Sequence, residues 1–263
     1  MPGTKSEDYP RLADAARRLA LEAGRTIMAF YRDGTTVETK ADRSPVTGAD
    51  RAADRLIVAG LHAADPHIPV ISEESTADDA LAAPPGGRFW LVDPLDGTRE
   101  FIARTGEFTV NIALIEDGRP VLGVLHAPVQ DEIYVADVLG QAVRIVGNGA
   151  PRPICARAVP GEGPAVVASR LHRDAKTDAY ITNLRPERIE SAGSALKFGL
   201  LARGEVDIYP RFGRTMEWDT AAGQAVLEAA GGHVRDLNGR ELRYGKAGLV
   251  NPPFVACGVD TAR

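Results

Sequence analysis

The segment at residues 89–102 constrains the fold of this chain more than any other segment. It begins with the apolar run Phe89 to Val92, which is typical of a short buried strand. Pro94 has no N–H group for a strand ladder, so we expect the strand to stop there, with Asp93 and Asp96 at its end. A helix at the following residues would direct its free N–H groups to the same place. This combination suits a hard cation bridging to a phosphate, whereas an isolated Asp-x-x-Asp is more often a turn with a helix cap.

Composition and charge exclude several classes of protein. The chain has 263 residues, of which 44% are apolar and 25% charged, as in ordinary globular proteins. Its net charge of −5, without a basic block, argues against nucleic-acid binding and favours a small-molecule partner. The two cysteines, Cys155 and Cys257, predict no disulfide framework, and no apolar run reaches the roughly eighteen residues of a transmembrane segment. We expect a cytoplasmic protein, with peripheral association at the inner membrane as the alternative.

The N-terminal part of the chain predicts helices followed by a sheet. Apolar spacing and turn signals indicate a helix, a strand, a polar loop, a helix and a strand, at residues 12–30, 37–40, 41–48, 50–61 and 68–71. After the central segment, apolar runs between turns predict an antiparallel meander, at residues 108–116, 121–126, 132–136 and 141–146.

The C-terminal part alternates between strands and helices. Gly147 to Pro151 is rich in Gly and Pro and is our candidate boundary between an N-terminal α+β half, residues 1–150, and a C-terminal α/β half, residues 151–263. The predicted strands lie at residues 165–168, 188–189 and 206–209. The predicted helices lie at residues 176–183, 194–202 and 220–230. Alternation of this kind favours a layered α/β protein.

Acidic residues follow predicted strands or precede a helix at three places. Glu73 and Glu74 follow the strand at 68–71, Asp93 and Asp96 follow the central strand, and Asp219 precedes the helix at 220–230. Taken alone, Glu73 and Glu74 could form a solvated acidic loop, and Asp219 could be a helix N-cap. Neighbouring carboxylates repel one another unless a cation or solvent compensates their charge. Three acidic places at the ends of elements therefore favour one shared cation site, if the fold brings them together.

Three motifs resemble the signature of the inositol monophosphatase superfamily of metal-dependent, lithium-sensitive phosphatases. They are Ser-Glu-Glu-Ser at 72–75, Trp-Leu-Val-Asp-Pro-Leu-Asp-Gly-Thr at 90–98, and Trp-Asp at 218–219 before a helix rich in Ala and Gly. Their order and spacing match over residues 40–232, most of the chain. The resemblance implies an α/β layered sandwich, the inositol monophosphatase and fructose-1,6-bisphosphatase-like fold, with the site between the two halves.

The resemblance also implies a set of metal ligands. One Mg²⁺ would be held by Glu73, Asp93 and the carbonyl of Leu95, and a second by Asp93, Asp96 and Asp219. Oxygen-only ligands independently favour Mg²⁺ over zinc. Glu74 would either bind a third ion or lie beside the ligands, and Lys40 would lie beside the ligands. Two or three Mg²⁺ ions are therefore expected.

The resemblance assigns water activation to Asp50 and Thr98. Asp50 matches the partner of the motif threonine, so that its carboxylate and the Thr98 hydroxyl would orient and deprotonate the attacking water. The backbone N–H groups of Gly97 and Thr98 would bind the phosphate. The alternative for Asp50 is a helix N-cap.

Substrate preference depends on residues 193–213. They resemble the 3'(2'),5'-bisphosphate nucleotidases of the CysQ type, because Lys197 and Arg211 are cations where inositol-selective enzymes carry apolar and acidic residues. These cations, with Ser194 and Asp219, would bind a substrate with a second phosphate. The alternative is that Lys197 belongs to the polar face of a helix and Arg211 to a solvated loop.

This resemblance implies a Mg²⁺-dependent phosphomonoesterase that removes the 3'-phosphate of adenosine 3',5'-bisphosphate to give AMP, and by extension acts on its sulfated form, in sulfur metabolism. An inositol 1-phosphatase or broader sugar phosphatase on the same frame is the first alternative. A non-catalytic nucleotide-binding or lithium- or Mg²⁺-sensing module is the second, but it would not need Asp50 and Thr98. The expected partner is a small phosphate ester, and the chain is expected to be a monomer or a homodimer.

Overall fold

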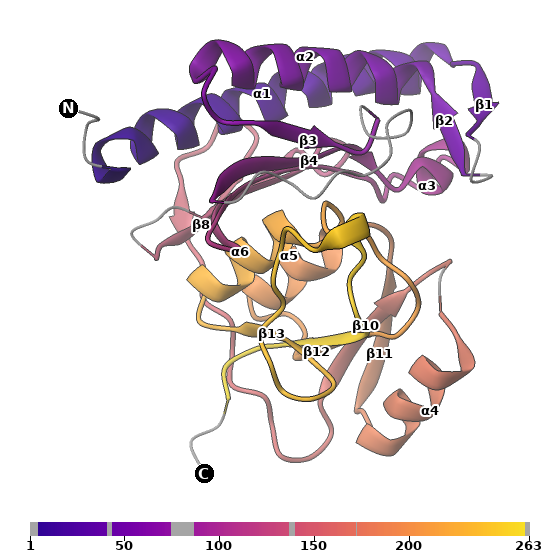
Figure 1. Cartoon of the computed structure of the whole chain (residues 1–263). Helices are drawn as coiled ribbons and strands as arrows, with labels where there is room; N and C mark the ends of the chain where they lie inside the picture. Colours follow the sequence, from indigo (N-terminus) through magenta and orange to yellow (C-terminus); the bar gives the residue numbers. More distant parts are fainter. Residues whose placement is uncertain (1–4, 41–43, 75–86, 137–139, 172, 261–263) are drawn as a thin grey trace.

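The computed structural model describes residues 5–40, 44–74, 87–136, 140–171 and 173–260. Ser75 of the first acidic motif and residues 41–43 of the predicted loop lie outside these ranges. Layers of helices and sheets alternate through the molecule (Figure 1), which confirms the predicted layered α/β architecture. In the part of the chain that is described, every helix is too short or too polar to cross a membrane.

Two long helices form one outer layer. Helix α1 (Lys5–Asp33) and helix α2 (Gly48–Ala64) bury their apolar stripes, including Leu19, Ile27 and Ile57, in one core with the adjacent sheet. Between them the chain forms a small antiparallel hairpin of β1 (Val37–Thr39) and β2 (Pro45–Thr47). The prediction of a loop over residues 45–47 was therefore wrong, because these residues pair with β1 before entering α2.

A seven-stranded sheet lies under these helices. Its strand order is β3-β4-β5-β6-β7-β8-β9, with β3 parallel to β4 and every other pair antiparallel, which confirms the predicted meander. The strands are β3 (Val70–Ser72), β4 (Arg88–Asp96), β5 (Thr109–Glu116), β6 (Arg119–Ala127), β7 (Glu132–Ala136), β8 (Ala142–Val146) and β9 (Arg152–Pro153). The short helix α3 (Thr98–Ile102) connects β4 to β5.

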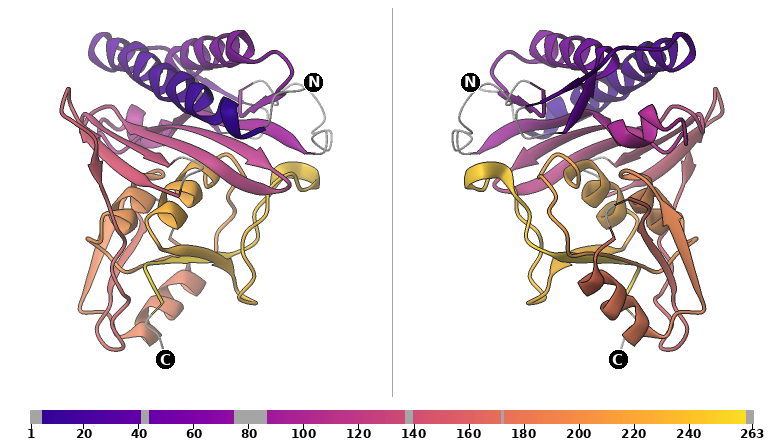
Figure 2. Two further views of the ribbon diagram at one scale, coloured as in Figure 1. Left: turned by 90° about the vertical axis from the view of Figure 1, so that its left-hand side faces the viewer. Right: turned by 90° about the vertical axis from the view of Figure 1, so that its right-hand side faces the viewer.

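Two inner helices separate this sheet from a second one (Figure 2). They are α5 (Leu196–Ala202) and α6 (Ala221–Ala229), and Ala221 and Ala222 of α6 pack against Phe89 and Leu91 of β4. Gly123 of β6 allows this close approach, since a Cβ atom there would lie 2.6 Å from the carbonyl oxygen of Ala222. The inner helices therefore contact the face of the sheet opposite α1 and α2.

The second sheet has five strands in the order β11-β10-β12-β14-β13. These strands are β10 (Ala165–Ser169), β11 (Arg188–Ala192), β12 (Ile208–Arg211), β13 (His233–Asp236) and β14 (Phe254–Cys257). Helix α4 (Ala175–Leu184) packs on its outer side, and the 3-10 turn η1 (Ala247–Leu249) precedes β14. The strands and helices predicted in this half are all present, and the boundary at residue 150 stays a prediction.

Candidate active site

One cavity brings together most of the residues that the sequence predicts for the site. Its walls include Glu73, Asp93, Leu95, Asp96, Gly97, Thr98, Ser194, Lys197, Arg211 and Asp219. The remaining predicted residues contact this wall from behind: Asp50 through Thr98, and Lys40 through Glu73. Glu74 in turn pairs with Lys40. The seven-stranded sheet, α5, β12 and the segment before α6 thus all contribute to one site.

A β-bulge in β4 brings Asp93 and Asp96 to the same cavity. Asp93 pairs with Asn111 and Asp96 with Thr109, so three steps along β4 face two steps along β5. In a regular strand, side chains three apart would point to opposite faces. Pro94 lies inside the irregular stretch, where a missing N–H group is tolerated. The prediction that Pro94 ends the strand was therefore wrong, because β4 continues through it to Asp96.

The carboxylates in the cavity wall have the electrostatics of a cation site. Burial raises the pKa of Asp93 well above its ordinary value, and the charges of Glu73 and Asp96 raise it further. Burial likewise raises the pKa of Asp219, with added repulsion from Asp96 and Glu73. A divalent cation would offset both effects. No His or Cys is among the described residues of the wall, and a donor set made of oxygens fits Mg²⁺.

Protein donors occupy these carboxylates at present. Glu73 pairs with the Lys40 amine at 2.9 Å, Asp96 Oδ2 accepts from the Ala195 N–H at 2.7 Å, and Asp219 Oδ2 accepts from the Met216 N–H at 2.8 Å. Accordingly, within the described ranges no group of three or more His, Cys, Asp or Glu side chains is already arranged to hold a metal ion. A cation at Glu73 would therefore compete with the Lys40 amine for that carboxylate.

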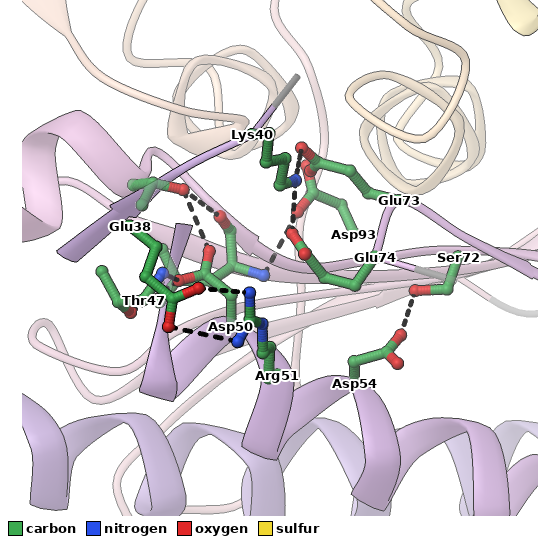
Figure 3. A network of polar contacts seen from close by, with 12 residues as sticks. Glu38, Lys40, Thr47, Asp50, Arg51, Asp54, Ser72, Glu73, Glu74 and Asp93 are labelled. Atoms are coloured by element: carbon green, nitrogen blue, oxygen red, sulfur yellow. Dashed lines mark hydrogen bonds and ion pairs between the residues drawn. The ribbon is translucent and has the colours of Figure 1, made fainter. Parts of the chain in front are cut away.

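Lys40 acts as the counter-ion of the first acidic motif (Figure 3). Its amine also lies 2.6 Å from Glu74, and both partners are largely screened from solvent. Burial alone would lower the pKa of Lys40, but Glu73 and Glu74 together outweigh it and raise that pKa. Burial raises the pKa of Glu74 to about 7 despite this ion pair. The alternative of a solvated acidic loop at Glu73 and Glu74 was therefore wrong.

Asp50 and Thr98 form the predicted hydrogen-bonded pair. The Thr98 hydroxyl donates to Asp50 Oδ1 at 3.0 Å, while Asp50 Oδ2 accepts from the Thr47 N–H at 2.7 Å and from the Thr47 hydroxyl at 2.6 Å. Burial raises the pKa of Asp50, although the bonds from Thr47 lower it. Thr47 is the N-cap of α2 and Asp50 completes its capping box, so the alternative of Asp50 as the N-cap was wrong.

Two cations, Lys197 and Arg211, also line the cavity. Lys197 is only 3% exposed, and its amine donates to the carbonyls of Ala192, at 3.2 Å, and Ser194 and lies 5.0 Å from the centre of the Tyr209 ring. Burial lowers the pKa of Lys197 to about 8. Arg211, on β12, is 8% exposed. The alternatives of a polar helix face for Lys197 and a solvated loop for Arg211 were therefore wrong.

Glu217 has a structural role that the sequence did not reveal. Although it adjoins Trp218 and Asp219, its carboxylate is completely buried and accepts from the Gly245 N–H at 2.6 Å and pairs with Lys246 at 2.6 Å. It thereby ties the segment before α6 to the segment before η1. In a sequence, a glutamate that is buried for structural reasons cannot be distinguished from a metal ligand. The hydrogen-bond donors around its carboxylate in the folded chain distinguish the two.

Several wall residues were not predicted. They are Arg99, Glu100, Ser169, Tyr209, Arg214 and Trp218 among others. Arg99 and Arg214 are exposed cations at the rim, and nothing in the sequence distinguishes them from ordinary solvated arginines. Tyr209 and Arg211 are two residues apart on β12, so their side chains lie on the same face of the sheet. This spacing is the signal in the sequence that could have predicted Tyr209 as a wall residue.

The fold and the site define a layered α/β protein with an acidic cavity that suits a phosphate ester and a divalent cation. The chain belongs to the Inositol monophosphatase family, whose profile matches residues 8–256. It is 47% identical over 254 residues to a protein of Escherichia coli K12 called 3'(2'),5'-bisphosphate nucleotidase CysQ, covering 92% of this chain and 98% of that protein.

Solved structures agree with this family assignment. The crystal structure of CysQ from Bacteroides thetaiotaomicron is 40% identical, with a TM-score of 0.81, and the match covers 94% of this chain and 96% of that one. An IMPase from Thermotoga maritima is 28% identical, with a TM-score of 0.76, over 93% and 91% of the two chains. Both matches extend over nearly the whole layered sandwich.

Proposed function

We propose that this protein is a Mg²⁺-dependent phosphomonoesterase that removes the 3'-phosphate of adenosine 3',5'-bisphosphate, yielding AMP, and acts on the 5'-sulfated form as well. Membership of the Inositol monophosphatase family supports a metal-dependent phosphatase, and the relatives called 3'(2'),5'-bisphosphate nucleotidase support the substrate class. A role in cytoplasmic sulfur metabolism follows from that substrate.

The opposed charges of the cavity are the observation that carries the substrate class. Four carboxylates, those of Glu73, Asp93, Asp96 and Asp219, and two cations, Lys197 and Arg211, line the same cavity, so it offers groups of both signs to a ligand with two phosphates. The first phosphate would lie at the carboxylates with the metal ions and the second at Lys197 and Arg211. Arg is suited to this role because its guanidinium donates two parallel hydrogen bonds to a phosphate.

The residues that would hold the ions are Glu73, Asp93, Asp96 and Asp219 with the carbonyl of Leu95, for two or three Mg²⁺ ions. Such ions supply Lewis-acid stabilisation of charge on the phosphate oxygens and on the departing alkoxide. The chain itself would have to release Glu73 and Glu74 from Lys40 when the ions arrive. Asp96 keeps its bond from Ala195 through Oδ2, which leaves Oδ1 for the cavity.

Thr98 and Asp50 would move the proton of the attacking water. The Thr98 hydroxyl already donates to Asp50, so its oxygen can accept a proton from water only as it passes its own proton to Asp50 Oδ1. The two bonds from Thr47 hold the other Asp50 oxygen and fix the direction of Oδ1. The raised pKa of Asp50 makes this carboxylate a better proton acceptor than an ordinary aspartate.

A substrate panel with two variants tests the proposal. Adenosine 3',5'-bisphosphate, AMP, inositol 1-phosphate and fructose 1,6-bisphosphate are offered to the wild type, Lys197→Ala and Arg211→Ala, with Arg235→Ala as a surface control. We expect the wild type to prefer the nucleotide bisphosphate. Each cavity variant should lose about ten- to a hundred-fold in kcat/KM on that substrate, the scale of one charge-assisted contact, and little on inositol 1-phosphate.

Three outcomes would contradict the assignment. A wild type that prefers inositol 1-phosphate would make the protein an inositol or general sugar phosphatase. Equal losses of both variants on every substrate would mean that Lys197 and Arg211 support the cavity rather than bind a second phosphate. A protein that binds the nucleotide but releases no phosphate with or without Mg²⁺ would be a binding module.

A further inference from the structure

An ion pair outside the cavity joins the two sheets beside the site. Glu107 lies between α3 and β5, Arg170 follows β10, and the guanidinium contacts both carboxylate oxygens, at 2.7 and 2.8 Å. Neither residue lines the cavity or belongs to the motifs of the family signature. Two parallel hydrogen bonds fix the relative orientation of the two side chains as well as their distance.

The pair also binds the turn that leads into α5, residues 193–195. Glu107 Oε2 accepts from the Gly193 N–H at 3.1 Å, and Arg170 donates to the carbonyl of Ser191 at 2.9 Å through its side chain. The Arg170 N–H donates to the Ala192 carbonyl at 3.3 Å. Contact with the backbone is so close that a Cβ atom on Gly193 would lie 2.7 Å from the Glu107 carbonyl oxygen. The turn is therefore fixed from both sheets.

This turn contacts two functional residues of the cavity, Asp96 and Lys197. Ser194 has a φ of +53°, a left-handed conformation that is costly for a residue with a Cβ atom and persists only where several contacts impose it. In that conformation the Ser194 hydroxyl and the Ala195 N–H donate to Asp96 Oδ2, at 2.8 and 2.7 Å. The carbonyls of Ala192 and Ser194 accept from the Lys197 amine.

We propose that Glu107 and Arg170 are positioning residues, which hold the 193–195 turn so that the Lys197 amine keeps its position in the cavity wall. The inference rests on the proposed function for its catalytic consequence. Asp96 is also anchored by the bulge of β4, whereas the described contacts of the Lys197 amine are the Ser194 carbonyl in this turn, the Ala192 carbonyl at the adjoining end of β11 and the Tyr209 ring. Loss of the pair should therefore weaken recognition of the second phosphate more than it slows the chemical step.

The kinetic test uses Glu107→Ala, Arg170→Ala and Glu107→Gln with adenosine 3',5'-bisphosphate and Mg²⁺. We expect KM to rise roughly tenfold in both alanine variants with kcat within about threefold of the wild type, as for a lost contact of a charged group. Glu107→Gln should recover most of the loss, because its amide oxygen still accepts from Gly193. The double alanine variant should be no worse than the worse single variant, since the two residues act as one unit. Arg188→Ala removes an exposed pair with Glu190 on β11 and serves as the control.

Hydrogen exchange supplies a readout that does not depend on the substrate. Peptides covering residues 189–198 should exchange at least tenfold faster in the alanine variants and at the wild-type rate in Arg188→Ala. Unchanged exchange, a fall in kcat with normal KM, or a glutamine variant as impaired as the alanine variant would each overturn the proposal. If exchange responds as expected but the wild type releases no phosphate from the bisphosphate, the proposed function fails while the positioning of the turn stands.

Discussion

Burial, more than any single partner, sets the protonation chemistry of the cavity residues. It raises the pKa of Asp50 and of Asp93 and lowers that of Lys197 to about 8. In each case burial disfavours the charged form of the side chain. The two aspartates therefore hold a proton more readily than usual, Lys197 loses its proton more readily, and a neighbouring opposite charge stabilises the charged form of each. The contact from Thr47 then decides which oxygen of Asp50 faces Thr98.

The Thr98 hydroxyl gives the most direct test of proton transfer. Thr98→Val keeps the side-chain volume and the backbone N–H, so KM should change little while kcat falls about a hundredfold or more, the usual scale of general base assistance. Thr182→Val, at an exposed threonine of α4, should leave both constants unchanged. A rise in KM at normal kcat would instead assign the Thr98 hydroxyl to phosphate binding.

Lys197 predicts an alkaline limit on bisphosphate recognition. Because its pKa in the folded protein is about 8, the amine loses its positive charge as the pH rises through that value. We expect kcat/KM for adenosine 3',5'-bisphosphate to decline above about pH 8, while the pH profile for inositol 1-phosphate lacks this limb. Lys197→Met should remove the limb along with the preference for the bisphosphate. A limb that persists in Lys197→Met would belong to another group.

Elements that depend on local pattern were predictable from sequence, and irregular ones were not. The periodicity of residues 12–30 and the apolar runs of the meander gave the right element types because each segment buries one face. The bulge at Asp93 and Asp96 depends on the register with β5, which no local pattern contains. Similarly, the burial of Lys197 and the inward pairing of Glu217 with Lys246 follow from contacts between distant segments.

The N-terminus of α2 links helix stability to catalysis. Thr47 caps α2 by accepting from the Ala49 N–H at 3.1 Å, and it also donates to Asp50. Thr47→Ala should lower the free energy of unfolding by about 1 kcal/mol, the usual cost of a lost N-cap, and should also lower kcat because Asp50 loses a donor that directs it. Urea unfolding and steady-state kinetics measure the two effects.

Asp174→Ala is the matched control for that variant. Asp174 caps α4 by accepting from the Thr177 N–H at 2.8 Å, and it is absent from the cavity wall. Its loss should cost similar stability at unchanged kcat. Equal losses of kcat in both variants would mean that lower stability, rather than the position of Asp50, reduces activity.

At the scale of the whole molecule, the site exists because separate layers deliver opposite charges to one cavity. Asp93 and Asp96 come from the seven-stranded sheet, Lys197 from an inner helix and Arg211 from the five-stranded sheet. Bringing Glu73, Asp93, Asp96 and Asp219 together opposes folding, since their charges repel one another. Stability and cation binding are therefore coupled.

This coupling predicts that Mg²⁺ stabilises the wild type and not a variant without Asp93. A ligand at about 100 times its Kd stabilises the folded state by roughly 2.7 kcal/mol, which for a chain of this size raises the Tm by several degrees. Asp93→Asn should lose the Mg²⁺-induced rise and most of the turnover. Its metal-free Tm should equal or exceed that of the wild type, because the substitution removes one repelling charge. Asp14→Asn, at an exposed aspartate of α1, controls for screening together with NaCl at equal ionic strength.

The pH dependence gives the sign of this coupling. The pKa values of Asp93 and Asp219 are higher in the folded chain than in the unfolded one, so these groups favour the folded, metal-free protein as the pH falls toward their ordinary value near 4. Protons and Mg²⁺ compete for the same carboxylates, so the Mg²⁺-induced rise in Tm should shrink as the pH is lowered from 8 toward 4. A rise that is constant over this range, or one that survives in Asp93→Asn, would locate the bound ion away from these carboxylates.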